Sequence, residues 1–239
     1  MSGFASFILS RGALKIAKSE NEYFKLKSGR LSPVFFNAGS LIDGEALHIL
    51  ANAYADKIAE LLKSGKLPSF DYVFGPAYKG IPLGAITCAA LFSRYNITKK
   101  FLYDRKEAKE HGDVKADSII VGANQFSHGG RILMIDDVIT TGGAKLQAWE
   151  KIAKVLHSPK LVGIIVAVDR QECGGDAEKK TSGAGEEIKK QLGCALFSIL
   201  TMGEIYSALA PALPAPDSAS WRKYFAKWGT KEAQVWAGK

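Results

Sequence analysis

The sequence predicts an α/β protein whose central sheet is mostly parallel. After residue 66, short apolar runs typical of strands alternate with segments of helical periodicity, and helices of this length fit the crossovers between parallel strands. A second observation is the segment 131–144, where an apolar run ends in acids, hydroxyls and glycines before a helical pattern begins. In an open α/β sheet, ligands bind at this kind of corner between a strand and a helix.

The first 65 residues predict a small N-terminal unit and then a long helix. A helix is expected over 2–18, because Phe4, Phe7, Ile8 and Leu14 fall near one face. Residues 23–37 predict a β-hairpin, because apolar and polar residues alternate before a Ser-Gly turn at 28–29. A helix is expected from 45 to 63, where apolar residues recur at helical spacing.

The alternating strands and helices follow. Strands are predicted over 72–75, 101–103, 119–122, 132–135, 161–168 and 195–200, and helices over about 82–92, 144–157, 185–192 and 202–210. The stretch 171–185 is rich in Gly, Lys and Glu and predicts a loop. Prolines at 211, 214 and 216 then separate a tail from the rest of the chain. Its aromatic residues Trp221, Tyr224, Phe225 and Trp228 have helical spacing, which favours docking on the chain's own core over contact with a partner.

Composition limits the classes of function. The chain has 239 residues, 47% apolar and 23% charged, which is typical of a soluble globular domain. We expect no membrane span and no secretory signal, because no apolar run reaches ~20 residues and the N-terminal apolar residues follow no charged leader. Cys88, Cys173 and Cys194 form no CxxC spacing, the four histidines are scattered, and free thiols suit a cytoplasmic protein.

The net charge of +8 is compatible with two classes of partner. A nucleic-acid-binding protein would carry the charge as a basic stripe, whereas an enzyme for anionic small molecules would concentrate it at a cleft. The basic residues are spread along the chain except around 105–111, which favours the enzyme and predicts no nucleic-acid partner.

The corner at 136–144 has the chemistry of a phosphate and sugar site. Asp136 and Asp137 suit sugar hydroxyls, or a metal ion through its waters. The hydroxyls of Thr140 and Thr141 and the backbone freed by two glycines suit a phosphate at a helix N-terminus. An acid pair alone is often only turn and cap chemistry, but the complete string favours a ligand with a phosphate beside a hydroxylated ring.

The charged segment 105–111 has two interpretations. Lys106 and Glu110 form an i, i+4 pair of opposite charge, as on a solvated helix, whereas Arg105 and Lys109 form a pair of like charge that a purely structural helix tends to avoid. Gly112 and the polar residues after it fit a loop that closes over a ligand.

The string from Asp136 to Ala144 resembles the PRPP-binding motif of type I phosphoribosyltransferases. Gly143 is a departure, because that family usually has Thr or Ser at this position, and backbone contacts would replace one hydroxyl contact to the 5′-phosphate. Further strings, over about residues 20–205, are similar to the orotate phosphoribosyltransferase family. They are 25–30, 35–37, 74–80, 103–112 and 169–172.

This resemblance implies the fold, the reaction and the assembly. The expected fold is a type I phosphoribosyltransferase-like parallel sheet flanked by helices, with a hood over about 1–44, a core over about 45–210 and a helical tail over 211–239. The expected reaction converts orotate and PRPP to orotidine 5′-monophosphate and pyrophosphate in pyrimidine biosynthesis. It implies Mg²⁺ held by PRPP and water without direct protein ligands, and a cytoplasmic homodimer with shared active sites.

The resemblance also assigns roles to residues. PRPP would be contacted by Lys27, Tyr78, Lys79, Arg105, Lys106, Lys109, His111, Asp136, Asp137, Val138, Ile139, Thr140, Thr141, Gly142, Gly143 and Ala144. Orotate would be contacted by Lys27, Phe35, Phe36, Thr140 and Arg170, with the two phenylalanines bracketing its ring. Lys79, Lys109, Asp136 and Asp137 are the implied catalytic residues. The structural alternatives are that Phe35 and Phe36 are core residues and that Tyr78 is a turn residue.

Two other functions fit parts of the pattern. A phosphoribosyltransferase for a purine or uracil would share the phosphate corner, but Arg170 favours an anionic base because a guanidinium pairs with a carboxylate. A PRPP-sensing regulator of nucleic acid would need an extended basic surface and would not need the charged segment.

Overall fold

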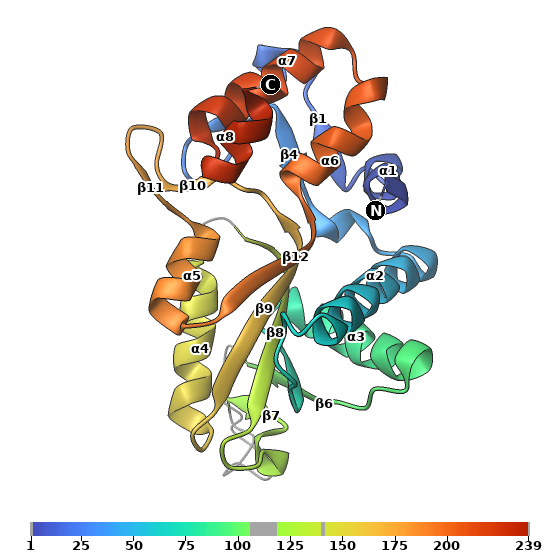
Figure 1. Cartoon of the computed structure of the whole chain (residues 1–239), viewed down its shortest axis with the longest axis vertical. Coiled ribbons are helices and arrows are strands. Elements are labelled where there is room, and N and C mark those ends of the chain that lie inside the picture. The colour runs from blue at the N-terminus through green and yellow to red at the C-terminus, as the bar shows by residue number, and fades with distance from the viewer. Residues whose placement is uncertain (1, 106–118, 140–141, 239) are drawn as a thin grey trace.

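The central sheet carries the predicted α/β architecture. The computed structural model describes residues 2–105, 119–139 and 142–238, and within them six strands form one sheet in the order β12-β9-β8-β5-β6-β7 (Figure 1). These strands are β5 (Tyr72–Gly75), β6 (Lys100–Asp104), β7 (Ile120–Val121), β8 (Arg131–Ile139), β9 (Lys160–Asp169) and β12 (Ala195–Thr201). Neighbours pair in parallel, but β7 is antiparallel to β6. The predicted fold class is therefore confirmed.

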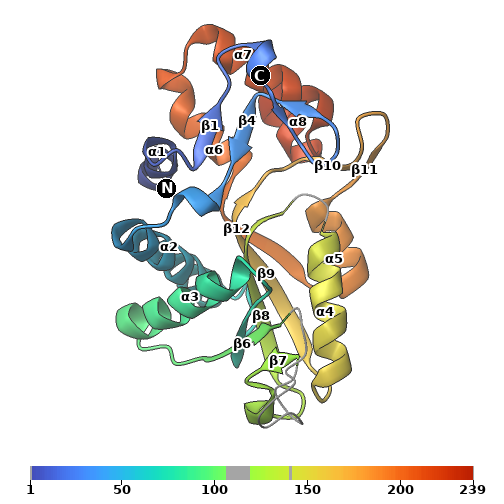
Figure 2. The ribbon, with the colours of Figure 1, turned by 180° about the vertical axis from the view of Figure 1, so that it is seen from behind.

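Helices cover both faces of this sheet. The helices α2 (Gly44–Lys63) and α3 (Gly80–Tyr95) lie on one face, and α4 (Gly143–Val155) and α5 (Ala184–Leu192) lie on the other (Figures 1 and 2). Alternate residues of β8 therefore enter different cores: Leu133 packs into one, whereas Met134 packs into the other. Burial on both faces explains why these strands read as unbroken apolar runs. No helix among the described residues is both long and apolar enough to cross a membrane.

A second layer lies over the carboxyl edge of the sheet, and both ends of the chain lie in it (Figure 1). From here on we call this whole layer the hood; it includes the expected hood over about 1–44 and also the elements after residue 201. It contains α1 (Ser2–Ser10), β1 (Leu14–Ile16), β2 (Phe24–Lys25), β3 (Leu31–Ser32), β4 (Val34–Phe36), α6 (Met202–Leu209), α7 (Ala215–Trp228) and α8 (Lys231–Ala237). The strands β2 and β3 form the predicted hairpin, and β1 pairs antiparallel with β4.

The aromatic tail docks on the chain itself, as predicted. Trp221 and Phe225 of α7 are fully buried. Tyr206 of α6 lies between two tail rings, 5.6 Å from the ring centroid of Trp221 and 5.0 Å from that of Trp236. Aromatic residues bury large apolar areas, so this cluster fixes the tail to α6. The helix α8 lies within the predicted helical tail, although its seven residues are too few for a periodic pattern that would give it bounds of its own.

The single helix predicted over 2–18 is wrong in its second half. The helix α1 ends at Ser10, and Gly12 takes a left-handed conformation with φ of 66°. Leu14 to Ile16 then form β1, which pairs with β4. A left-handed glycine terminates helices, and the pairing with β4 is a distant contact that helical periodicity does not report.

The loop predicted over 171–185 is also wrong, because it contains the hairpin of β10 (Cys173–Gly175) and β11 (Lys180–Gly183). The hairpin has few apolar residues and therefore no alternating signal. It is held from outside by Arg30, whose guanidinium donates hydrogen bonds to the carbonyls of Cys173, Gly174 and Asp176 at 2.6–2.8 Å. This buried guanidinium satisfies carbonyls that the short hairpin leaves unpaired.

The central strand is longer than predicted. The apolar run stops at Ile135, yet β8 continues to Ile139, because β9 pairs with it as far as the register Ile139 and Asp169. The two acids therefore lie within the strand near its carboxyl end and not after it. A rigid strand consequently positions both carboxylates.

Candidate functional site

A cavity of about 840 Å³ lies between the carboxyl edge of the sheet and the hood. Most of the residues predicted from the sequence line it. They are Lys27, Phe35, Phe36, Tyr78, Lys79, Asp136, Asp137, Val138, Ile139, Gly142, Gly143, Ala144 and Arg170. These side chains come from segments more than 100 residues apart, so the fold brings them together as the motifs predict.

Several predicted residues are not in this set. Arg105 lies at the end of β6, where its backbone amide donates to the Ile119 carbonyl at 2.8 Å, and it does not line the cavity. The predicted roles of Lys106, Lys109, His111, Thr140 and Thr141 fall outside the described residues.

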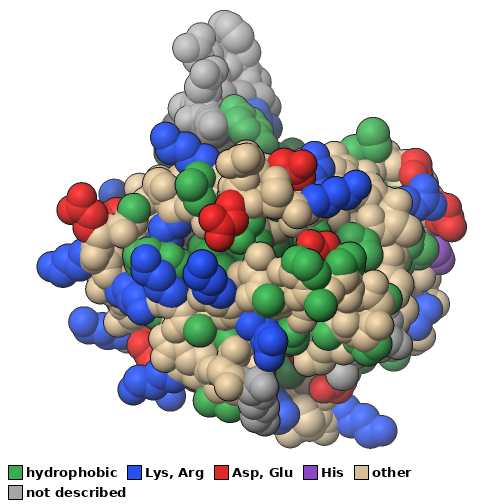
Figure 3. Space-filling model, turned by 90° about the horizontal axis from the view of Figure 1, so that it is seen from above, with side chains coloured by type: hydrophobic (Ala, Val, Ile, Leu, Met, Phe, Trp, Pro, Cys, Tyr) green, Lys and Arg blue, Asp and Glu red, His purple; other side chains and the backbone are tan. Residues whose placement is uncertain are grey.

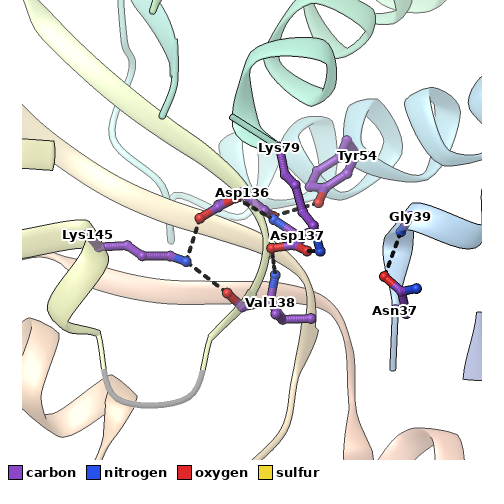
Figure 4. A network of polar contacts seen from close by, with 8 residues as sticks. All are labelled: Asn37, Gly39, Tyr54, Lys79, Asp136, Asp137, Val138 and Lys145. Atoms are coloured by element: carbon purple, nitrogen blue, oxygen red, sulfur yellow. Dashed lines mark hydrogen bonds and ion pairs between the residues drawn. The ribbon is translucent and has the colours of Figure 1, made fainter. Parts of the chain in front are cut away.

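Both carboxylates at the end of β8 pair with lysines (Figure 4). The Asp136 carboxylate lies 2.5 Å from Nζ of Lys145, and the Asp137 carboxylate lies 2.9 Å from Nζ of Lys79. The backbone is fixed as well, because the buried Tyr54 hydroxyl of α2 donates to the Asp136 carbonyl at 2.7 Å. The acids therefore have defined positions before any ligand arrives.

Burial changes the protonation of this pair. Burial raises the pKa of the Asp136 carboxyl above its ordinary value, and the nearby Lys145 ammonium opposes that rise. Burial, followed by the charges of Asp137 and Asp136, also raises the pKa of Tyr54 well above its ordinary value. Tyr54 therefore stays neutral and remains a hydrogen-bond donor.

The segment before α3 carries Lys79 into the site. The Ala77 amide of this segment donates to the Asp104 carboxylate at 2.6 Å, which anchors it to the end of β6. The Lys79 side chain is 58% exposed although it pairs with Asp137. An exposed ammonium on an anchored backbone is free to exchange a carboxylate for an anionic ligand.

The N-terminus of α4 has the geometry of a phosphate site. Gly142 is the N-cap residue and has a left-handed φ of 81°. Gly143 is the first helical residue, its φ lies outside the left-handed region, and no described atom lies within 4 Å of a Cβ built there. The backbone amides at this end of the helix are available to an anion.

We predict different effects of substitution at Gly142 and at Gly143. Gly143→Thr is expected to tighten PRPP binding about 2- to 10-fold, the contribution of one hydrogen bond, with Gly143→Ala as the control that adds only a methyl group. Gly142→Ala is expected to weaken binding and lower the melting temperature, because a side chain disfavours left-handed backbone. Calorimetry with PRPP and thermal melts of the three variants test this. Equal losses at both positions would contradict it.

The expected contact of two phenylalanine rings with one ligand ring stays a prediction, and both residues line the cavity. Adjacent residues of a strand point to opposite faces, so Phe35 and Phe36 of β4 differ in their exposure. Phe36 is 4% exposed and belongs to the core. Phe35 is half-buried and lies 5.6 Å from the Phe24 ring, measured between centroids. Phe35 therefore offers the more accessible aromatic face to a flat base.

Arg170 lines the cavity directly after β9, beside the end of β8, and takes part in a buried ion pair. It is 4% exposed, and its Nη2 lies 2.6 Å from the Glu172 carboxylate. Its Nε has no hydrogen-bond partner among the described residues. The guanidinium charge lies at the cavity wall, so the site suits an anionic group.

The lining residues that the sequence analysis did not assign to the site include Arg30, Lys145 and Glu172. Glu172 orients Arg170, and Arg30 lies in the carbonyl cluster described above while its guanidinium also lies 4.3 Å from the Trp228 ring centroid. The sequence signal for Lys145 was a lysine at a buried-face position of α4, together with Ala148 and Ile152.

The basic side chains on the upper face are spread out and mixed with acidic ones (Figure 3). The lysines and arginines that matter for an anionic ligand are those lining the cavity, namely Lys25, Lys27, Arg30, Lys79, Lys145 and Arg170. The cavity thus combines cations, three carboxylates, a phosphate-type helix N-terminus and aromatic rings. It can hold a phosphorylated sugar beside a flat anionic base.

Fold and site together define a phosphoribosyltransferase of type I. The family model described as "Phosphoribosyl transferase domain" matches residues 43–198. Among curated proteins, the orotate phosphoribosyltransferase of Bifidobacterium adolescentis is 39% identical over 206 residues, covering 86% of this chain and 84% of that protein. That of Neurospora crassa is 42% identical over 212 residues, covering 86% and 88%.

A solved structure agrees with these relatives. The crystal structure of orotate phosphoribosyltransferase from Francisella tularensis has a TM-score of 0.77 and 31% sequence identity, and covers 95% of this chain and 100% of its own. The chain belongs to the phosphoribosyltransferase family and, within it, to the orotate phosphoribosyltransferases.

Proposed function

We propose that this protein transfers the phosphoribosyl group of PRPP to orotate, giving orotidine 5′-monophosphate and pyrophosphate for pyrimidine biosynthesis. The observation that carries the proposal is a single cavity lined by Asp136 and Asp137, a phosphate-type helix N-terminus and the guanidinium of Arg170. Its relatives of 39% and 42% identity are named for this activity.

Different residues bind different parts of the two substrates. The α4 N-terminus with Gly142 and Gly143 holds the 5′-phosphate, Asp136 and Asp137 accept hydrogen bonds from the ribose hydroxyls, and Arg170 with Phe35 holds the orotate carboxylate and ring. Breaking the bond at C1 gathers negative charge on the departing pyrophosphate. Preplaced cations such as Lys79 stabilise that charge more in the transition state than in the ground state.

A Mg²⁺ ion bound to PRPP is compatible with these roles of the residues. Both carboxylates already have ammonium partners, and no group of three or more His, Cys, Asp or Glu side chains able to hold a metal occurs among the described residues. We propose that Mg²⁺ arrives bound to the oxygens of PRPP and to water. The ion supplies charge neutralisation for the leaving pyrophosphate, which Lys79 shares.

We also propose a cytoplasmic homodimer in which the segment after β6 serves the neighbouring subunit's cavity. Arg105 does not line the cavity of its own subunit, which supports this arrangement, and the free thiols of Cys88, Cys173 and Cys194 suit the cytoplasm. Mixing Lys109→Ala with Asp136→Ala/Asp137→Ala tests the shared site. Hybrid dimers should restore about a quarter of wild-type activity for random pairing. No recovery despite confirmed subunit exchange would rule out a shared site.

A steady-state assay with PRPP and alternative bases tests the function. We expect turnover with orotate and little with uracil, hypoxanthine or adenine, because only orotate presents a carboxylate to Arg170. Equal turnover of uracil and orotate would contradict orotate specificity. PRPP binding without transfer to any base would instead support a regulatory protein.

A further inference from the structure

Lys145 is a buried lysine at the catalytic acids. It is 6% exposed as a residue, forms the 2.5 Å ion pair with Asp136, and its Nζ donates to the Val138 carbonyl at 2.8 Å (Figure 4). Lys145 therefore links α4 to Asp136 and to Val138. It holds the strand end of the phosphate-binding segment close to the helix end.

The position of Lys145 on α4 would suit an apolar residue. Lys145, Ala148 and Ile152 are the buried residues of α4, spaced along one helix face, and the latter two belong to the core. Burying an ammonium costs free energy that pairing with a carboxylate often does not recover, and a buried ion pair replaced by apolar residues is frequently as stable or more stable. Packing alone therefore does not explain a lysine here.

The two lysines at the acid pair differ in exposure. The Lys79 side chain is 58% exposed, whereas the Lys145 side chain is 7% exposed and its partner Asp136 is 13% exposed. Lys79 has room to move to a pyrophosphate and return. Lys145 is enclosed by the strand and helix that it joins, so it remains with Asp136 when a ligand enters.

We propose that Lys145 is a positioning residue of the phosphoribosyl site: it is the fixed counter-ion that keeps the Asp136 carboxylate ionised and aimed at the ribose hydroxyls. This proposal rests on the proposed PRPP-dependent function and adds a residue to it. Lys145 sets the affinity for PRPP through Asp136 and does not itself need to touch PRPP.

The charged surroundings of Asp136 support this role. Lys145 faces it from α4, Asp137 follows it on β8, the neutral Tyr54 approaches from α2, and Lys79 is paired with Asp137. Burial and the Asp137 charge raise the pKa of Asp136, and Lys145 lowers it. Without Lys145 the Asp136 carboxyl would take up its proton at higher pH, and a protonated carboxyl is a weaker acceptor for two hydroxyls.

The first experiment compares Lys145→Met with wild type. Methionine fills a similar volume without the charge, and Lys154→Met, an exposed lysine of the same helix, is the control. We expect Lys145→Met to raise the Kd for PRPP at least ten-fold at pH 7 and to move the acid limb of kcat/KM for PRPP to higher pH. Lys154→Met should change neither, and melts should show that both variants are folded.

A double-mutant cycle separates this mechanism from others. In an Asp136→Asn background, Lys145→Met should weaken PRPP binding no further, and it should restore some binding if the unpaired ammonium is itself harmful. A purely structural lysine, or one that contacts PRPP directly, would cause the same loss in both backgrounds and overturn the proposal. An unmoved acid limb in Lys145→Met would also overturn it.

A ligand-free measurement distinguishes this proposal from the proposed function. Carboxyl carbon NMR of Asp136 without PRPP should show a higher pKa in Lys145→Met than in wild type. Wild-type protein that fails to bind PRPP would refute the proposed function, and the positioning role with it. Normal wild-type binding with an unchanged Asp136 pKa would refute the positioning role alone.

Discussion

Replacing Arg170 with alanine is expected to raise the KM for orotate about 30- to 1000-fold, because truncating one side of a buried charged hydrogen bond costs about 2–4 kcal/mol. The KM for PRPP should change less than about 3-fold, since we assign the phosphate and ribose groups to the α4 N-terminus and the two acids and not to Arg170. The physical basis is the 4% exposed guanidinium whose Nε has no partner among the described residues. Orotate provides the acceptor.

The control must account for Glu172, the buried ion-pair partner of Arg170. Arg170→Ala alone leaves the Glu172 carboxylate without its 2.6 Å counter-ion, and the fold would be destabilised for that reason. The variant Arg170→Ala/Glu172→Gln removes both charges and should melt closer to wild type while keeping the orotate defect. A double variant with normal orotate KM would exclude Arg170 from the orotate site.

Asp137→Asn is expected to raise the Kd for PRPP about 10- to 150-fold, the value of a hydrogen bond to a charged group. The asparagine Oδ1 can still accept the Val138 amide, which the aspartate accepts at 2.8 Å, so the backbone of β8 should be preserved. The substitution removes the negative charge that Asp137 presents to the ribose hydroxyls and to Lys79. Calorimetry with PRPP measures the affinity, and a thermal melt measures folding.

Asp71→Asn is the matched control, because it also removes an aspartate from an ion pair at β8. Its carboxylate lies 2.9 Å from Nη2 of Arg131, at the opposite end of the strand. PRPP affinity should not change. The hydrogen bond from Arg131 lowers the pKa of Asp71 to about 2, so this pair stabilises the fold above the ordinary pKa and loses that effect as pH falls toward 2. Equal loss of PRPP affinity in both variants would assign Asp137 a purely structural role.

The local patterns of the sequence were sufficient for the layered architecture. The strand runs at 72–75 and 161–168 were recognisable because both faces of the sheet are buried, which leaves uninterrupted apolar residues. The phosphate corner was recognisable because its residues are contiguous from Asp136 to Ala144. Where a motif is local, its chemistry can be predicted from order and spacing.

Features that depend on distant contacts were not predictable. Leu14 to Ile16 form a strand because β4 lies beside them, and the 173–183 hairpin persists because Arg30, far away in sequence, supplies donors to its carbonyls. The facing of Phe35 and Phe36 follows from their pairing in β4, which places Phe36 in the core. None of these contacts leaves a periodic trace in the local sequence.

By itself, the sequence determined the α/β class, the corner that suits a phosphate and a ribose, and the position of Arg170 after a strand, because each depends on residues that are neighbours in the chain. The tertiary structure alone decided which charges meet. Asp136 pairs with Lys145, Asp137 with Lys79 and Arg170 with Glu172, and the burial of each pair differs. A charge acquires its effect from the desolvation and the partners that packing imposes on it, and these are set only when strand, helix and hood come together.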